Sequence, residues 1–238
     1  MKLFAAIIFL FIPFAQPKDM TSTELLKKMY AKYHGKWHNN LSFNQTTEMY
    51  RKDSLFKSQT WYEHILYPDK LRIEFDKPGS GNGIIFRGDS TYVISNNKVT
   101  RSIKNENELI FFLGGMYFVP FDQVLAHFKA LNYDLAKFHE DTWKGKPVFV
   151  IGADKPDEKV NQLWIDQEKL VSVRFIKYDG DTKEEGTFED QVALKKAWSE
   201  TLCKFYINDH VLQVERYHDV VAGGPVDKNL FEPSMVGK

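Results

Sequence analysis

The sequence has little cysteine. Cys203 is the single cysteine among 238 residues, so no disulfide can form within the chain and the fold must rely on its hydrophobic core. Material for a core is present, because 43% of the residues are hydrophobic and 15% are aromatic. Cys203 lies in an alternating stretch, residues 201–205, which favours a small apolar filler over the alternative of a reactive thiol.

The sequence also lacks an excess of charge of either sign. Lysine and arginine number 32, and aspartate and glutamate also number 32. Nucleic acids and anionic membrane surfaces select basic patches. We therefore expect neither of them as a partner.

Long hydrophobic runs are absent after the first residues of the chain. Met1 and Lys2 precede an apolar run, residues 3–14, and Ala15 follows it. This order is typical of a secretory signal peptide, and a run of twelve residues is shorter than the ~20 that span a bilayer. A membrane anchor or a buried strand is the alternative. No cysteine follows the run, so we expect residues 1–15 to be removed and residues 16–238 to form one soluble, unanchored, monomeric domain in the periplasm.

Motifs for catalysis or metal binding are missing as well. Gly-x-Ser-x-Gly does not occur, and the glycine-rich turn at residues 79–83 is followed by a predicted strand instead of a helix. His34 and His38 have the spacing of a helical metal pair, but Gly35 predicts that the helix ends between them. We expect no enzyme activity, no metal and no cofactor. Two distant carboxylates of a hydrolase stay possible, since spacing does not exclude them.

The first regular element is a predicted helix over residues 22–34. Thr21 and Glu24 have the spacing of a capping box, and apolar residues follow at helical spacing. Beyond Trp37 the apolar period changes to two. Short runs with turn residues between them predict an antiparallel meander with strands at residues 41–47, 58–67, 71–75, 84–86, 91–94, 98–103, 133–138, 147–153, 162–165, 170–178, 186–193, 201–208 and 211–220.

Residues 105–131 interrupt this rhythm and predict one or two helices, broken at Gly114-Gly115 and at Pro120. Within them, residues 109–121, here called the apolar insert, carry no charge. A helix that is apolar all round is buried on more than one side. The insert is either a central core helix or a movable lid hinged at the glycines and the proline. The lid would use Leu109, Ile110, Phe112, Leu113, Met116 and Phe118.

Roughly ten strands in one sheet must curl or close. The predicted fold is therefore mainly β with α: a single strongly curved antiparallel sheet, an unclosed half-barrel, with helices capping its concave side. Such a sheet encloses a cavity.

Five sequence blocks resemble the LolA/LolB-type carriers, exported half-barrels that ferry acylated proteins between bacterial membranes. The blocks fall in the family's order and span most of residues 16–238. They are Leu41-Ser-Phe-Asn-Gln-Thr-Thr47, Trp61-Tyr62 with Tyr67-Pro-Asp-Lys-Leu71-Arg-Ile-Glu74, Ile84-Ile-Phe-Arg-Gly-Asp89 with Tyr92-Val93, Leu163-Trp-Ile-Asp166, and Asn229-Leu-Phe-Glu-Pro233.

The resemblance implies an open barrel of about eleven strands and a role as a periplasmic carrier of lipoprotein or lipid acyl chains. An inner-membrane donor complex and an outer-membrane acceptor would be its transfer partners. The best-known carriers often place an arginine, which ties down the lid, just before the proline that is Pro68 here; this chain has Tyr67. The apolar groove implied by the resemblance is lined by Ile65, Leu71, Ile73, Phe75, Ile84, Phe86 and Val93.

Two other functions stay open. A sensor or assembly module of the same fold would bind a protein segment in the groove. An exported hydrolase would need two or more acids that converge in one polar cleft, and an apolar cavity floor would argue against it.

Overall fold

The first helix begins as the capping box predicts. The computed structural model describes residues 20–156 and 158–238, in which α1 spans Ser22–Tyr33. The Thr21 hydroxyl accepts a hydrogen bond from the Glu24 backbone N–H at 3.2 Å, and the Glu24 carboxylate accepts one from the Thr21 N–H at 3.0 Å. One face of α1 is buried in the core. The expected signal peptide, residues 1–15, lies outside the described residues.

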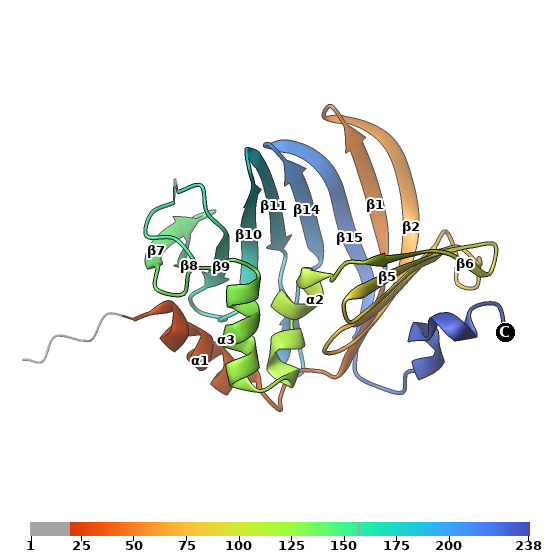
Figure 1. Ribbon diagram of the computed structural model, residues 1–238, viewed down its shortest axis with the longest axis horizontal. Coiled ribbons are helices and arrows are strands. Elements are labelled where there is room, and N and C mark those ends of the chain that lie inside the picture. The colour runs from red at the N-terminus through yellow and green to blue at the C-terminus, as the bar shows by residue number, and fades with distance from the viewer. Residues whose placement is uncertain (1–19, 157) are drawn as a thin grey trace, which may run out of the picture.

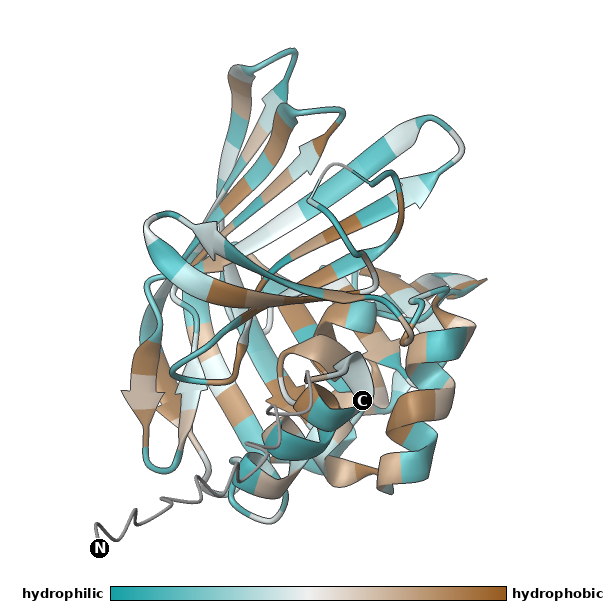
Figure 2. Ribbon diagram, turned by 90° about the vertical axis from the view of Figure 1, so that its left-hand side faces the viewer, coloured by the Kyte–Doolittle hydropathy of each residue, from teal (hydrophilic) through white to brown (hydrophobic). Residues whose placement is uncertain are grey.

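Thirteen strands form one antiparallel sheet that curves without closing (Figure 1), which confirms the predicted fold class. Hydrophobic and hydrophilic residues alternate along many of its strands (Figure 2). The strands of this sheet are β1 (Asn40–Arg51), β2 (Ser54–Leu66), β3 (Lys70–Phe75), β4 (Gly83–Arg87), β5 (Ser90–Ser95), β6 (Lys98–Lys104), β7 (Phe138–Trp143), β8 (Lys146–Ile151), β9 (Gln162–Asp166), β10 (Ser172–Asp179), β11 (Thr182–Glu189), β14 (Leu202–Ile207) and β15 (His210–Ala222).

The strand order is β6-β5-β4-β3-β2-β1-β15-β14-β11-β10-β9-β8-β7. Most neighbours follow one another in the sequence, but β1 pairs with β15 and so joins the two halves of the meander. The two outer strands, β6 and β7, are consecutive strands in the chain. The segment that connects them, residues 105–137, therefore has to pass from one edge of the curved sheet to the other.

That connecting segment is helical, with the interruptions that the sequence predicts. It contains α2 (Glu108–Phe112), the 3-10 helix η1 (Gly115–Phe118) and α3 (Phe121–Ala130). The break after α2 requires glycine, because Gly114 has a φ of +146° and a Cβ atom there would lie 2.3 Å from Nε1 of Trp37. A Cβ atom on Gly115 would lie 2.4 Å from the carbonyl oxygen of Pro68.

The predicted strand at residues 133–138 is wrong. Asn132 has a positive φ and turns follow it, so the strand begins only at Phe138. Tyr133 is buried among aromatic rings, with its ring centroid 5.6 Å from that of Phe112 and 5.5 Å from that of Phe128. Its burial therefore comes from packing against the helices and does not require a strand. The sheet also has two strands more than the eleven that the resemblance implies, and the short hairpin of β12 (Val192–Leu194) and β13 (Ala197–Ser199) was not predicted.

The C-terminal segment covers part of the convex face of the sheet, opposite to the face that carries Phe86. Two 3-10 helices, η2 (Lys228–Phe231) and η3 (Pro233–Met235), form there, and η2 contacts β3 and β4. Phe231 is fully buried, and an ion pair of 2.8 Å joins Arg87 Nη1 to Glu232 Oε2. No helix in the described part of the chain combines the length and hydrophobicity that crossing a bilayer requires.

We predict that Phe128→Ala lowers the free energy of unfolding by about 3–5 kcal/mol, because it leaves a cavity where the ring is fully buried among Phe111, Phe112 and Tyr133. Urea denaturation measures this change. The matched control is Phe56→Ala, whose ring is 53% exposed and whose loss should change stability little. Equal effects of the two substitutions would show that Phe128 does not anchor α3.

Candidate functional site

The register of the strands brings the predicted groove residues onto one face of the sheet. Side chains of Cα partners in neighbouring antiparallel strands point to the same side. Ile65, Leu71 and Phe86 form one such row across β2, β3 and β4. Ile73 and Ile84 belong to the next row. Their apolar surfaces therefore face one side together.

This face borders a cavity of about 440 Å³. Residues from β3 and β4 line it together with residues from β10 and β11, although five other strands separate β4 from β11 in the sheet order. The sheet thus curves around the cavity. Five of the seven predicted groove residues lie in its wall, namely Ile65, Leu71, Ile73, Ile84 and Phe86.

The other two predicted groove residues lie outside the cavity wall. Phe75 is paired with Trp61 in the register and their rings are 5.2 Å apart, so Phe75 packs against a lining residue. Val93 is paired with Ile84 on the side nearer the edge strand β6. Both extend the apolar face beyond the cavity.

The apolar insert divides between the cavity and the core. Leu109, Ile110 and Leu113 line the cavity. Phe112 and Met116 are buried in the hydrophobic core. The backbone of the insert is tied to the sheet, because the Ser172 hydroxyl donates a hydrogen bond to the Phe112 carbonyl at 3.0 Å. The insert is at once a wall of the cavity and a part of the core, and its movement as a lid stays a prediction.

Tyr67, at the position of the expected latch, contacts the insert directly. Its hydroxyl donates a hydrogen bond to the Leu113 carbonyl at 3.1 Å. Its ring lies parallel to that of Phe118, with the ring centroids 5.5 Å apart. Burial raises the pKa of Tyr67, so the hydroxyl remains a donor at physiological pH. Tyr67 thus contacts the insert through both its hydroxyl and its ring, and its role as a latch stays a prediction.

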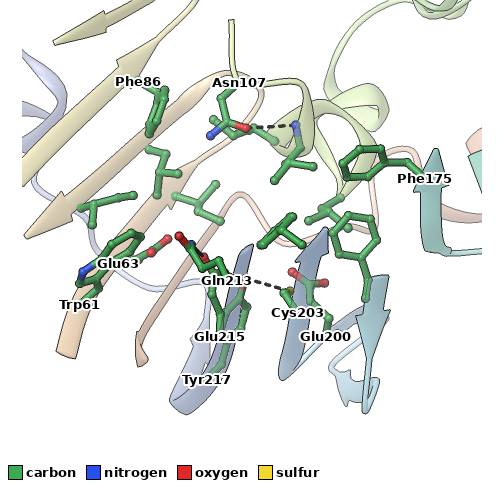
Figure 3. A pocket seen from close by; sticks show the side chains of 18 of the residues that line it. Trp61, Glu63, Phe86, Asn107, Phe175, Glu200, Cys203, Gln213, Glu215 and Tyr217 are labelled. Carbon is green, nitrogen blue, oxygen red and sulfur yellow. Dashed lines mark hydrogen bonds between the residues drawn. The ribbon is translucent and has the colours of Figure 1, made fainter. Parts of the chain in front are cut away.

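Three glutamates that the sequence analysis did not single out also line the cavity (Figure 3). Glu63 comes from β2, Glu215 from β15, and Glu200 from the turn between β13 and β14. Their exposed fractions are only 6%, 8% and 7%. The signal was present in the alternation of the strands, because Glu63 stands two residues from Trp61 and from Ile65 and so shares their inward side.

The surroundings of these carboxyls are mainly apolar, and the resulting burial raises their pKa values. Burial raises the pKa of Glu200 to about 7, with Glu215 nearby adding to the effect. Burial likewise raises the pKa of Glu215 to about 7. Burial, together with the other two carboxyls, raises the pKa of Glu63 well above its ordinary value. At neutral pH the three groups therefore carry much less than three negative charges.

Glu215 is the best hydrogen-bonded of the three. Its carboxylate accepts from Nε2 of Gln213 at 2.5 Å and from the Tyr217 hydroxyl at 3.3 Å. The Cys203 thiol in turn donates to the Tyr217 oxygen at 3.3 Å. Cys203 is buried and its pKa is raised well above the usual value, which suits the predicted small filler and not a reactive thiolate.

The two histidines with metal-pair spacing point to different surroundings. Nδ1 of His34 lies 2.9 Å from the Tyr117 carbonyl. His38 is buried, no described residue is a hydrogen-bond partner for either of its ring nitrogens, and burial lowers its pKa to about 4. Within residues 20–156 and 158–238, no group of three or more histidine, cysteine or acidic side chains is placed to hold a metal ion.

The raised pKa values predict a stability that falls as pH rises. Glu200 has a pKa of about 7 in the folded protein, above its ordinary value of 4.5, so its contribution is complete below pH 4.5 and is lost as pH rises through 7. For one carboxyl this difference amounts to about 3 kcal/mol. We predict that Glu200→Gln reduces the loss of unfolding free energy between pH 5 and pH 8 by about 2–3 kcal/mol.

Urea denaturation at the two pH values measures this loss. Glu184→Gln serves as the control, because Glu184 is an exposed residue at the cavity rim and should leave the pH dependence unchanged. An identical pH dependence for wild type and Glu200→Gln would refute the buried, protonated state of Glu200.

Comparison with known proteins extends these observations at the level of the fold. No protein-family model matches the sequence, and no curated protein matches it significantly. Among solved structures, the chain is similar to a DUF1329 family protein from Desulfovibrio piger, with a TM-score of 0.62 and 14% identity, over 90% of this chain and 97% of that one.

Two further structures are similar over nearly their whole length. A LolA superfamily protein from Nitrosomonas europaea has a TM-score of 0.57 and 12% identity, over 89% of this chain and 97% of that one. A protein domain from Vibrio parahaemolyticus, described as outer membrane lipoprotein-sorting, has a TM-score of 0.59 and 12% identity, over 91% and 98%. This chain therefore has the open, curved-sheet fold of the LolA superfamily, as the resemblance in its sequence predicts.

Proposed function

We propose that this protein is a periplasmic carrier that holds the acyl chains of a lipoprotein or lipid in its cavity during transfer between membranes. One observation carries the proposal: a predominantly apolar cavity on the concave face of a LolA-type sheet, walled on one side by the uncharged insert. The solved structure described as lipoprotein-sorting supports this at the level of fold analogy.

The energetics of an acyl chain suit such a cavity. Burying one methylene stabilises by about 0.8 kcal/mol, so a sixteen-carbon chain exposed to water costs roughly 12 kcal/mol. Walls such as Ile65, Leu71 and Phe86 offset part of this cost by replacing water with apolar contacts. A carrier also has to release its cargo, which requires that the empty cavity is itself stabilised.

The apolar insert provides that stabilisation in the proposal. Leu109, Ile110 and Leu113 face the cavity and would exchange their contacts for cargo. The hydrogen bond from Tyr67 to Leu113 contributes about 1 kcal/mol, which is small enough to be broken on each cycle. The aromatic core beneath the insert would stay in place and limit its movement to the Gly114-Gly115 break and its flanks.

The route and the partners belong to the same proposal. Residues 1–15 would direct export and be removed, and residues 16–238 would act as a single LolA-like domain. An inner-membrane donor would load the cavity and an outer-membrane acceptor would empty it. A sensor that binds a protein segment in the same groove is the alternative, and such a protein would not retain acyl ligands.

The hydrolase alternative is weakened by the pKa values of the acids. Three carboxyls do converge, but a glycosidase needs one ionised and one protonated carboxyl, and therefore environments that move two pKa values apart. In this cavity burial raises the pKa of Glu63, Glu200 and Glu215 alike. The walls around them are mainly apolar, which favours binding over hydrolysis.

We predict that Ile84→Trp lowers the affinity for a neutral sixteen-carbon monoacylglycerol at least about tenfold, because the indole would occupy the cavity. Native mass spectrometry of protein purified without detergent and titration with the lipid measure the effect. Val93→Trp is the matched control, since Val93 is the Cα partner of Ile84 on the same face but lies outside the cavity wall. A wild-type protein that takes up no acyl ligand would overturn the carrier proposal.

We predict that Tyr67→Phe speeds amide hydrogen exchange of residues 109–118 by about fivefold, because it removes one hydrogen bond and keeps the ring that stacks on Phe118. Hydrogen exchange followed by mass spectrometry resolves this segment. Tyr62→Phe is the control, since no hydrogen bond of the Tyr62 hydroxyl occurs within the described residues. Unchanged exchange in Tyr67→Phe would show that Tyr67 does not restrain the insert.

A further inference from the structure

The charges of the cavity wall are all of one sign. Its lining includes the five glutamates at positions 63, 184, 185, 200 and 215, and no lysine, arginine or histidine. Glu185 is neutralised by Arg174 at 2.7 Å and by Lys183 at 3.0 Å, and Glu184 is exposed at the rim. Beside the three deep glutamates, residues 20–156 and 158–238 place no such cation. An apolar chain alone would not require any of the three.

Glu63 is the least satisfied of these groups. Its side chain lies in the cavity wall and points toward Gln213 and Glu215 (Figure 3). The residue is only 6% exposed, yet no hydrogen bond or ion pair reaches its carboxyl from any residue that the structure describes. A buried carboxyl without a donor is costly, whether it is protonated or ionised.

A second group nearby lacks a donor independently of the acids. Gln45 on β1 is fully buried, and its register partners are Trp61 on β2 and Tyr217 on β15, both lining residues. Its Nε2 donates to the Thr47 hydroxyl at 2.9 Å, and its amide lies close enough to Glu215 to lower the pKa of that carboxyl. Its Oε1 finds no hydrogen-bond partner in the part of the chain that the structure describes. Glu63 in the cavity wall and Gln45 behind it thus each have an acceptor without a donor among the described residues.

Aromatic rings border the same part of the cavity. Trp61 lines the cavity next to Glu63, and Phe43 stacks on Tyr217 with the ring centroids 4.0 Å apart. Aromatic faces attract cations, and more strongly where water is excluded. Carboxyls combined with aromatic rings form a favourable environment for an ammonium group. A metal ion is a poorer fit, since the described residues offer no group of three ligands for one.

We propose that the cargo is an amphiphile with a protonated amine, whose ammonium group lies among Glu63, Glu200 and Glu215 while its chain lies along Leu71, Ile84 and Phe86. This inference rests on the proposed function, the binding of an acyl or alkyl chain in the cavity, and adds the chemistry of the polar end. An ammonium brings three donors and one positive charge, whereas the described lining offers no cation and gives the Glu63 carboxyl no donor.

The proposal carries a pH dependence with a defined sign. The titratable groups that face the ammonium position are Glu63 from β2, Glu200 from the turn before β14, Cys203 from β14, and Glu215 and Tyr217 from β15. Glu184 and Glu185 on β11 stand farther along the wall together with Tyr206 on β14, the register partner of Glu185, and Tyr67 lines it at the end of β2. The insert and its N-cap Asn107 contribute no ionisable group to this lining.

Glu200 and Glu215 have pKa values of about 7, whereas burial raises the pKa of Cys203, Tyr67, Tyr206 and Tyr217 above their ordinary values. The ionised form of Glu200 and Glu215 grows as pH rises through about 7. An ammonium ligand stabilises that form, so its binding should release protons and strengthen from pH 5 to pH 8. A neutral ligand of the same chain should show no such gain.

The test compares ligands with one chain and different polar ends. Dodecylamine, dodecanol and dodecanoate are titrated by calorimetry below their micelle concentrations, into the full chain purified without detergent. We expect dodecylamine to bind at least about tenfold more tightly than dodecanol at pH 7, and dodecanoate to bind more weakly than both. Proton release is measured by repeating the amine titration in buffers of different ionisation enthalpy.

Substitutions then locate the ammonium. Glu63→Gln combined with Glu215→Gln keeps the shape of the site and removes two acids; it should lower the amine affinity at least about tenfold and leave dodecanol binding unchanged. Asp181→Asn is the matched control, because Asp181 is an exposed acid in the turn between β10 and β11, outside the cavity lining; it should leave both affinities unchanged. Circular dichroism and urea denaturation verify that the double variant folds.

The outcomes separate this inference from the proposed function. If dodecanol binds and dodecylamine binds no better, the ammonium proposal fails while the carrier proposal stands. If none of the three ligands binds, both fail. An amine preference that survives in the double variant would place the ammonium elsewhere and overturn the assignment to these glutamates.

Discussion

The pairing of β1 with β15 is the constraint on which the rest of the architecture depends. It joins two meanders that would otherwise be separate sheets, and it places β6 and β7 at opposite edges although they are consecutive strands. Because the sheet curves, the connection between these edges has to cross the concave face. The absence of charge in residues 109–121 follows from that path, because a segment packed between apolar surfaces has no water to solvate a charged side chain.

The same geometry explains why a cavity remains. Phe111, Phe112, Phe128 and Tyr133 fill the space between the helices and the sheet with aromatic rings. Farther along the strands the insert presents only Leu109, Ile110 and Leu113, and the sheet continues beyond it. The interior is thus solid on one side and open on the other. The cavity lies where the helices cease to follow the curve of the sheet.

Sequence periodicity predicts much of this fold and part of the site. Alternation put Ile73 on the same face as Leu71 and Phe75, and the register pairs Ile73 with Ile84 in the cavity wall, because side chains in strands have a period of two whatever the topology. It failed at Tyr133, where apolar residues in a turn imitate a strand. It also gave no reason to combine Glu63 with Glu215, which are 152 positions apart. Only the register of β2, β1 and β15 brings them to one cavity.

The buried glutamates show how a binding site and a stable core compete for the same positions. Each of them costs stability as pH rises, and apolar residues at these places would remove that cost. In the folded protein the cost is limited by protonation, since burial raises the three pKa values toward or above neutrality. Proton uptake thus lets an otherwise apolar cavity keep polar groups while it is empty. A ligand with a positive charge would reverse that uptake, so the groups that weaken the empty protein would become the ones that recognise the cargo.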